Sequence, residues 1–389
     1  MEFTSKQVIV LGAGAAGLAA ARDLVCSGFE PLILEARERI GGRILTVHDP
    51  QFPSPVELGA EFVHGRHPAL WEVIRESGAP VAEIAGGGDW AEMDRIFDRM
   101  REAPEQSFAE FIATVDAPEY LKRAATGFVE GFNAAHKERV SVEWLNREKA
   151  ASDEIEGDRS FRVRSGYDSV PRFLSQGLDI RLGTPVRRIR WKRGEVIAET
   201  DSGEVRSAKA IVTVPMAVLF ANALTIDPEP PVLTQARRAI GTGQAIRVTF
   251  GFREAIRQTG FLHADEPFPV CWTDGPLVTA WAGGSKADAL GAHSPEALKR
   301  IALASLRGIL GEDPGEPVGA WFHDWRTDPW SRAAYSYVCV GGMKVQQSLS
   351  DPVEDTLYFA GEAVAPSGHI GTVHGAIVSG RKAASPIIA

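Results

Sequence analysis

A glycine-rich loop near the start of the chain has the residue types and spacing needed to hold a phosphate. The loop reads GAGAAG over residues 12–17, between a β-branched run and an Ala- and Leu-rich helical pattern, and a second apolar strand then ends at Glu35. In this order Gly12 makes a tight turn, Gly14 lets the backbone approach a pyrophosphate, and Gly17 lets the helix pack on the strand. The helix N-terminus attracts phosphate, and Glu35 accepts hydrogen bonds from ribose hydroxyls. The segment therefore predicts a dinucleotide site.

A pair of glycines flanked by arginines follows this acid. The segment reads RIGGR from Arg39 to Arg43. Adjacent glycines permit unusual backbone angles, and an arginine binds phosphate through its planar fork of donors. Because the segment comes directly after the ribose-binding strand, we expect Gly42 and Arg43 to contact the pyrophosphate.

A second anion site is predicted near the end of the chain. A buried strand, 357–360, leads into Gly361 and Glu362, and a helix of small residues begins near Gly371 and Thr372. The N-terminus of a helix carries partial positive charge and exposes backbone N–H groups. We expect this helix end to face a group that carries negative charge.

The elements that must position these residues indicate two domains. Residues 68–148 have a helical pattern, 180–214 reads as a β-meander with a turn at 201–203, and 227–231 is a proline-rich boundary. From 243 to 320 strands and helices alternate. We predict an α/β protein with a discontinuous Rossmann-type domain and a mixed sheet-and-helix substrate domain. The first would comprise 1–67, 166–226 and 325–389, and the second 68–165 and 227–324.

Composition limits the classes of function. The chain has 389 residues, 44% of them hydrophobic and 24% charged, and a net charge of −9, which argues against nucleic acid as a partner and is compatible with a cationic substrate. Its three cysteines have neither metal-ligand spacing nor a disulfide framework. The sequence leaves no room for a signal peptide before the first strand and has no run of membrane-spanning length. We expect a cytoplasmic, reduced protein without a metal centre, whose oligomeric state the sequence does not define.

Motifs along nearly the whole chain resemble those of the flavin amine oxidases. This family includes polyamine oxidases, monoamine oxidases, amino-acid oxidases and flavin histone lysine demethylases. In chain order, the motifs are the loop at 12–17, EAR to GGR at 35–43, ELGA at 57–60, TPVRRI at 184–189, TVP at 213–215, DPW to Tyr at 328–335, FAGE at 359–362 and TVHGA at 372–376. The resemblance implies FAD as cofactor.

For the nucleotide half of FAD, the resemblance implies contacts from four side chains or backbone groups. Glu35 would bind the adenosine ribose, Arg37 and Arg43 would lie along the pyrophosphate, and Val186 would meet the adenine through its backbone. The remaining motif positions expected at the cofactor are Ala15, Ala16, Ala36, Gly42, Gly59, Ala60, Glu61 and Gly361.

For the flavin half, the resemblance places Trp330 near the isoalloxazine and Glu362 near the ribityl or phosphate portion. Thr372 and Val373 would present the helix end to the N1–C2 carbonyl edge. A reduced flavin is anionic at this edge, and a helix N-terminus stabilises negative charge.

The resemblance also implies how the amine is held. Tyr335 matches one aromatic wall of the substrate cage, whereas Thr372 stands in the place of the second wall, as in animal-type polyamine oxidases and the histone demethylases. His64, in GAEFVHG, is expected to accept a hydrogen bond from the substrate amine.

Two positions depart from the family pattern. Ala334 stands where monoamine oxidases carry the cysteine bonded to the flavin, so we expect FAD to be held without a covalent bond. Arg247 stands where the family has a lysine that holds a water near flavin N5 and assists the reaction with oxygen. Arginine is planar and binds through forked donors, so oxygen or a different electron acceptor remains open. Together with Tyr335, His64 and Thr372, Arg247 completes the predicted catalytic set.

The leading interpretation is an FAD-dependent amine oxidoreductase. Hydride would pass from the amine-bearing carbon to flavin N5, and water would hydrolyse the resulting imine. A polyamine-like or other primary or secondary amine is favoured as substrate. The alternatives are a desaturase or porphyrinogen-type oxidase of the same fold, an amine dehydrogenase with a non-oxygen acceptor, and a flavoprotein that mainly binds a protein partner.

Overall fold

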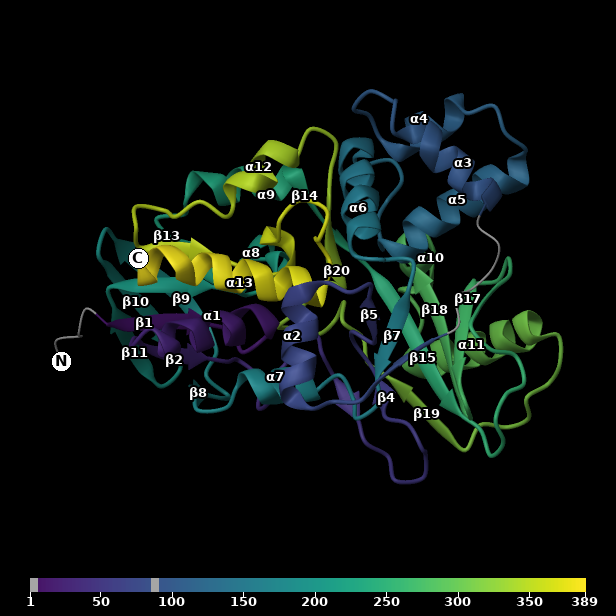
Figure 1. Cartoon of the computed structure of the whole chain (residues 1–389), viewed down its shortest axis with the longest axis horizontal. Coiled ribbons are helices and arrows are strands. Elements are labelled where there is room, and N and C mark those ends of the chain that lie inside the picture. The colour runs from purple at the N-terminus through teal and green to yellow at the C-terminus, as the bar shows by residue number, and fades with distance from the viewer. Residues whose placement is uncertain (1–5, 85–90) are drawn as a thin grey trace.

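A parallel sheet forms the centre of the half of the molecule that holds the C-terminal helix (Figure 1). The computed structural model describes residues 6–84 and 91–389. The strands stand in the order β21-β12-β1-β2-β8. Their bounds are β1 Gln7–Leu11, β2 Glu30–Leu34, β8 Asp179–Arg181, β12 Lys209–Val212 and β21 Leu357–Phe359. The central strands are apolar and buried on both faces, as a sheet covered by helices on its faces requires.

Two helices of small residues pack against each other on this sheet. They are α1 (Ala15–Cys26) and α13 (Val373–Ile388), which lie side by side in Figure 1. A Cβ at Gly380 of α13 would lie 2.1 Å from the Ala16 carbonyl oxygen, so glycine is needed for this close approach. Helix α13, whose N-cap is Thr372, is the helix that the sequence predicts near Gly371 and Thr372.

The predicted meander is correct in its middle and wrong at its ends. An antiparallel meander is formed by β9 (Val186–Lys192), β10 (Glu195–Thr200) and β11 (Gly203–Ser207), with β13 (Thr225–Asp227) parallel to β9. The flanking strands β8 and β12 instead pair in parallel with β2 and β1. Residues 210–212 are fully buried, which is typical of a strand inside a parallel sheet and not of a half-exposed meander.

The other half of the molecule is built on an antiparallel sheet with helices on one side (Figure 1). The strand order is β16-β17-β18-β15-β19. The bounds are β15 Ala245–Gly251, β16 Phe261–His263, β17 Val270–Asp274, β18 Leu277–Gly283 and β19 Gly319–Phe322, with α10 Gly284–Leu290 and α11 Pro295–Leu310. Every residue of β15 is buried, so this strand forms part of a core and positions any side chain it carries rigidly.

Further helices and short sheets complete the fold. The helices are α3 Ala91–Met100, α4 Phe108–Thr114, α5 Glu119–Phe132, α6 Val142–Glu154, α7 Ser169–Leu174, α8 Met216–Phe220, α9 Pro231–Ala239, α12 Met343–Ser348 and the 3₁₀ turn η1 Glu362–Val364. The short sheets pair β3 Thr46–Val47 with β4 Val56–Glu57, β14 Ile240–Gly243 with β20 Tyr335–Val338, and β5 Phe62–His64 with β7 Ser160–Val163, which also pairs with β6 Val81–Glu83.

Helix α2 (Pro68–Ser77) belongs with the parallel sheet in its packing. Its buried residues Leu70, Val73 and Ile74 share a hydrophobic core with α1 and α13. The sequence boundary after residue 67 had placed this helix in the substrate domain. The described helices include none that is both long and apolar enough to cross a membrane.

Candidate active site

One large cavity, of about 1780 Å³, runs from the carboxyl edge of the parallel sheet to the antiparallel sheet. Gly12, Glu35, Thr213 and Gly361 each stand one to two positions beyond the end of a parallel strand, the edge at which such sheets bind ligands. Every site residue predicted from the sequence lines this cavity, with the exception of Gly17. The fold therefore brings the separated motifs to one place.

The glycine loop has the shape that the sequence pattern requires. Gly12 has a φ of +105°, which favours glycine, and Gly17 packs so closely that a Cβ would lie 2.0 Å from the Gly12 carbonyl oxygen. A Cβ at Gly14 would instead meet no protein atom within 4 Å, and the Gly42 loop lies next to it. Gly14 is the N-cap of α1 and offers no side-chain acceptor, so the first N–H groups of the helix are free to bind an anion.

Glu35 holds the glycine loop in place. Its carboxylate accepts hydrogen bonds from the backbone N–H of Ala13 (2.7 Å) and of Arg37 (2.9 Å). The side chain is buried and lines the cavity. A carboxylate can accept more than two hydrogen bonds, so these contacts leave capacity for the ribose hydroxyls that the sequence predicts.

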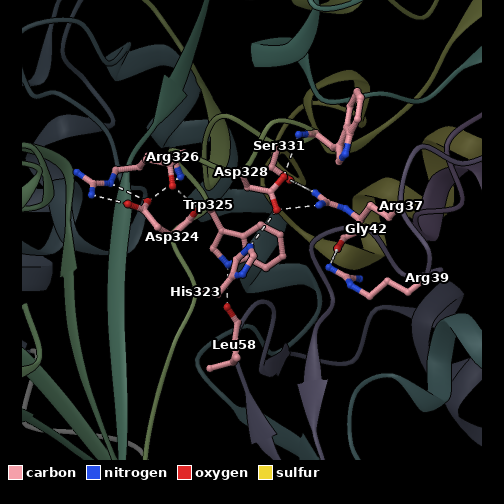
Figure 2. A network of polar contacts seen from close by, with 12 residues as sticks. Arg37, Arg39, Gly42, Leu58, His323, Asp324, Trp325, Arg326, Asp328 and Ser331 are labelled. Carbon is pink, nitrogen blue, oxygen red and sulfur yellow. Dashed lines mark hydrogen bonds and ion pairs between the residues drawn. The ribbon is translucent and has the colours of Figure 1, made fainter. Parts of the chain in front are cut away.

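Arg37 is committed to a protein carboxylate. Its guanidinium donates two parallel hydrogen bonds of 2.7 Å to Asp328 and a third, of 2.8 Å, to the Ser331 hydroxyl (Figure 2). Burial alone would raise the pKa of Asp328, but hydrogen bonds from His323 and Arg37 hold it well below its ordinary value. Arg37 therefore fastens the DPW segment to the cofactor side of the cavity, in addition to any contact with a pyrophosphate.

The two arginines that flank the glycine pair behave differently. Arg39 turns back on its own loop and donates to the carbonyl oxygens of Ile40, Gly42 and Ile44. Figure 2 shows the bond to Gly42. Arg43 lines the cavity. Of the pair, Arg43 is thus the one placed to reach a phosphate.

Glu362 joins three segments around the cavity. Its carboxylate accepts hydrogen bonds from Arg43 (3.1 Å), from the Ser336 N–H and hydroxyl (3.2 and 2.9 Å) and from the Gly371 N–H (3.1 Å). Arg43 also donates to the Ala334 carbonyl oxygen at 2.6 Å. These bonds fix the start of β20 and the turn before α13 relative to the glycine pair.

Two tryptophans of the cavity wall contact different segments of the chain. The Trp330 ring lies 5.2 Å from the guanidinium carbon of Arg187, the neighbour of Val186. Trp325 donates to the Leu58 carbonyl oxygen at 2.7 Å, and a Cβ at Gly59 would lie 3.2 Å from its ring. Trp325 is therefore the tryptophan beside the ELGA loop. Both tryptophans line the cavity, and Trp330 stays the one that the resemblance expects near the isoalloxazine.

Helix α13 begins at the cavity wall. Thr372 is its N-cap, and the Thr372 hydroxyl accepts a hydrogen bond from the Gly375 N–H and donates one to the His369 carbonyl oxygen. The Thr372 hydroxyl is therefore engaged in capping the helix, and it does not take over the role of an aromatic second wall in the substrate cage. The exposed helix end with Val373 faces the cavity, as an anion site at this position requires.

Arg247 belongs to a buried network of charges. From β15 it donates to the Gly59 carbonyl oxygen (2.9 Å) and to Glu61 (2.6 Å), while Arg162 donates to the other carboxylate oxygen of Glu61 at 2.6 and 2.9 Å. Burial alone would raise the pKa of Glu61, but Arg162 and Arg247 lower it, so Glu61 is ionised. The Nε of Arg247 is buried with no hydrogen-bond partner among the described residues. Glu61 thus positions Arg247 in the cavity wall.

His64 and Tyr335 stand at the part of the cavity formed by α5. Burial lowers the pKa of His64 to about 4, so its imidazole is neutral at pH 7 and one ring nitrogen can accept a hydrogen bond. The Tyr335 hydroxyl donates to the Phe132 carbonyl oxygen at 2.5 Å, and the Phe132 ring lies 5.5 Å from the His64 ring. The two predicted substrate contacts are therefore joined by one aromatic residue.

Several cavity residues had no signal in the sequence pattern. They are Trp272, Trp281, Trp325 and Glu148. The acids whose position the sequence left open, Glu83, Glu105 and Glu110, do not line the cavity. Glu83 pairs with Arg159 at the surface, and the other two cap or anchor helices. A metal-binding group of histidine, cysteine or acidic residues is not found in the part of the chain that the structure describes.

A glycine loop and a second helix end facing one cavity, with an acid at the end of the second strand, define a protein that holds a nucleotide cofactor. The family model described as flavin containing amine oxidoreductase matches residues 15–87 and 83–388. The chain therefore belongs to this family: it is a flavin-dependent enzyme that oxidises amines.

Curated relatives and solved structures agree with this assignment. Polyamine oxidase 2 of Arabidopsis thaliana is 28% identical and covers 99% of this chain and 88% of its own length. Polyamine oxidase 3 of Oryza sativa subsp. japonica is 30% identical, with 97% and 88% covered. A redesigned double mutant of putrescine oxidase has a TM-score of 0.85 at 25% identity, with 98% and 99% covered. Cyclohexylamine oxidase from Brevibacterium oxydans IH-35A has a TM-score of 0.84 at 21% identity, which shows a shared fold.

Gly14→Val should fold but lose the flavin, whereas Gly17→Val should lose the fold. The side chain at Gly14 would extend into the space where the cofactor phosphates are expected, and the side chain at Gly17 would collide with the Gly12 backbone. The two variants are matched because they insert the same residue three positions apart. The measurements are the flavin-to-protein ratio and the melting temperature of the flavin-free protein. Normal flavin content in Gly14→Val would contradict the position of the loop.

Glu35→Ala should weaken flavin binding by about 1.5–3 kcal/mol, the usual contribution of hydrogen bonds to a buried charged acceptor. The loss would come from the ribose contact and from the freed N–H of Ala13. Glu30→Ala, at the exposed start of the same strand, is the control. Fluorescence titration of flavin-free protein measures the dissociation constant. An unchanged constant in Glu35→Ala would show that the acid makes no contact with the cofactor.

Proposed function

We propose that the enzyme binds FAD without a covalent bond and oxidises a primary or secondary amine of the polyamine type. The extent of the cavity supports a dinucleotide, because it reaches from the glycine loop past the α13 N-terminus to β15. Ala334 lines the cavity at the position of the tethering cysteine, and Cys339 does not line it. The relatives support the substrate class: two are named polyamine oxidases, and putrescine oxidase has been solved bound to putrescine.

The observation that carries the proposal is the pairing of a neutral histidine with an aromatic wall beside an anion-stabilising helix end. When bound, the flavin accepts a hydride from the carbon that bears the amine, and water then hydrolyses the imine to an aldehyde or ketone and free amine or ammonia. His64 would accept a hydrogen bond from the amine and hold it in its uncharged form. Tyr335 would orient it, and the N-terminus of α13 would stabilise negative charge on the cofactor.

Anaerobic addition of amines should bleach the flavin absorbance, and denaturation should release FAD into the supernatant. A panel of polyamines, diamines, monoamines and amino acids defines the class of substrate. His64→Asn should raise the amine concentration needed for half-maximal reduction while flavin content stays normal. Flavin that no amine bleaches would overturn the proposed reaction, and flavin that remains with the precipitated protein would overturn non-covalent binding.

Arg247 favours a slow reaction of the reduced flavin with oxygen. An electron acceptor other than oxygen is therefore a candidate. A guanidinium spreads its charge over a plane, and here two of its nitrogens are bound by Gly59 and Glu61. It cannot hold a water in the way a compact ammonium does. We propose that the enzyme acts as an amine dehydrogenase whenever an acceptor other than oxygen is present.

Arg247→Lys should raise the rate constant for reoxidation of the reduced flavin by oxygen by about tenfold or more, because a compact ammonium stabilises developing superoxide better than a bound guanidinium. The rate of reduction by the amine should change much less. Arg164→Lys, a surface arginine paired with Asp274, is the control. Stopped-flow mixing of reduced enzyme with oxygen measures the constant. Fast reoxidation of the wild type would contradict the proposal.

A further inference from the structure

Three histidines cluster beside the start of α13, and the reaction described above does not use them. His369 precedes the helix, His374 lies in its first turn, and His67 is the N-cap of α2. The His374 ring stacks on that of His67, with the ring centroids 4.7 Å apart and an interplanar angle of 11°. His374 Nε2 and His369 Nδ1 form a hydrogen bond of 3.2 Å. Because a neutral imidazole carries one N–H donor and one acceptor, this bond allows a proton to pass between the two rings.

The hydrogen-bonded pair leads from the cavity to the surface. His374 lines the cavity and is only 4% exposed, whereas His369 does not line the cavity and is partly exposed. The inner end of the pair lies near the amine cage, because a Cβ at Gly371 would lie 3.3 Å from the Tyr335 ring. A positive charge on His64 would lower the pKa of His374, so these two rings are also within electrostatic reach of each other.

The surroundings of the pair favour movement of a proton outward. Burial lowers the pKa of His374, charge on His64, His67 or His369 would lower it further, and the positive end of α13 disfavours charge at the same place. Burial also lowers the pKa of His369, but Glu154, an exposed residue at the end of α6, partly raises it. A proton on the pair is therefore held better at the outer ring than at the inner ring, and neither ring retains it at pH 7.

We propose that His374 and His369 conduct the proton that the substrate ammonium loses from the cavity to the surface. The inference rests on the proposed function, in which hydride leaves the carbon of an uncharged amine. An aliphatic amine in water at pH 7 is a cation, as the lysine side chain is, so one proton must leave the buried site in each turnover.

The transfer balances over the two halves of the reaction. The proton crosses the cavity through water and binds Nδ1 of His374, the Nε2 proton of His374 shifts to Nδ1 of His369, and His369 releases its own Nε2 proton to solvent. When oxygen is the acceptor, its reduction to hydrogen peroxide takes up one proton, which returns along the pair in the opposite direction and restores both rings. His67 takes no part, because its Nδ1 accepts the Ala69 N–H as the cap of α2.

The test mixes enzyme and amine without oxygen in a weakly buffered solution that contains a pH-indicator dye. The amine is the one of the panel that reduces the flavin fastest. In His369→Gln, proton release and flavin bleaching should both slow by about 10- to 100-fold, up to the lower end of the contribution usual for a proton-transferring side chain. The amine concentration for half-maximal reduction should stay within about twofold, because binding is unchanged. Glutamine can still form a hydrogen bond with His374 but does not bind a further proton.

His369→Ala should slow both signals in the same way, and imidazole added to the solution should restore most of the rate, because this position is partly exposed. His67→Asn is the matched control, since asparagine remains a good N-cap and His67 lies outside the hydrogen-bonded pair. It should release the proton at the wild-type rate. Flavin content and the melting temperature of the flavin-free protein show whether each variant keeps the fold.

Wild-type proton release in His369→Gln would show that the proton leaves through the mouth of the cavity and would overturn the inference. Equal slowing in His67→Asn, or slowing in His369→Ala that imidazole does not relieve, would overturn it as well, because either result indicates a role in packing alone. The proposed function would survive each of these outcomes. A wild-type flavin that no amine reduces would overturn the proposed function itself and the inference with it.

Discussion

Buried arginine–carboxylate pairs hold together a site whose residues come from distant parts of the chain. Arg37 reaches Asp328 across 291 positions, and Arg43 reaches Glu362 across 319. The Arg37 pair is bidentate and its side chains are only 11% and 4% exposed, so water and salt screen it little. Loss of one partner would leave a buried charge without compensation, which costs far more than the loss of a surface ion pair. The geometry of the side of the cavity expected to hold the cofactor therefore depends on these two ion pairs.

The parts of the site that could be predicted are those encoded by neighbours in the chain. The spacing of Gly12, Gly14 and Gly17 and the strand that ends at Glu35 form one local unit, and the conformation of each glycine matches its expected role. The same is true of Thr372 as the cap of α13. Local hydrogen bonding and packing determine these features, so residue type and spacing are sufficient to identify them.

The parts that could not be predicted depend on which distant segments meet. The sequence pattern singles out Arg247 and Glu61 separately but does not pair them. Their network with Arg162 exists only because β15, the ELGA loop and β7 converge. Similarly, Trp325 and Trp330 are close in sequence yet contact different segments of the chain. The pairing of β8 and β12 was missed for the same reason, because a hydrophobic pattern does not identify the partner strand.

The cavity is completed by segments that lie far apart in the sequence. The glycine loop is synthesised before the strand β21, Glu362 and the N-terminus of α13, which complete the cavity. At synthesis rates of about 5–20 residues per second, the loop waits tens of seconds for its counterpart. During that interval the small apolar face of α1 that later packs on α13 has no cover from this helix. Flavin capture by the complete cavity is therefore a step that follows synthesis of α13.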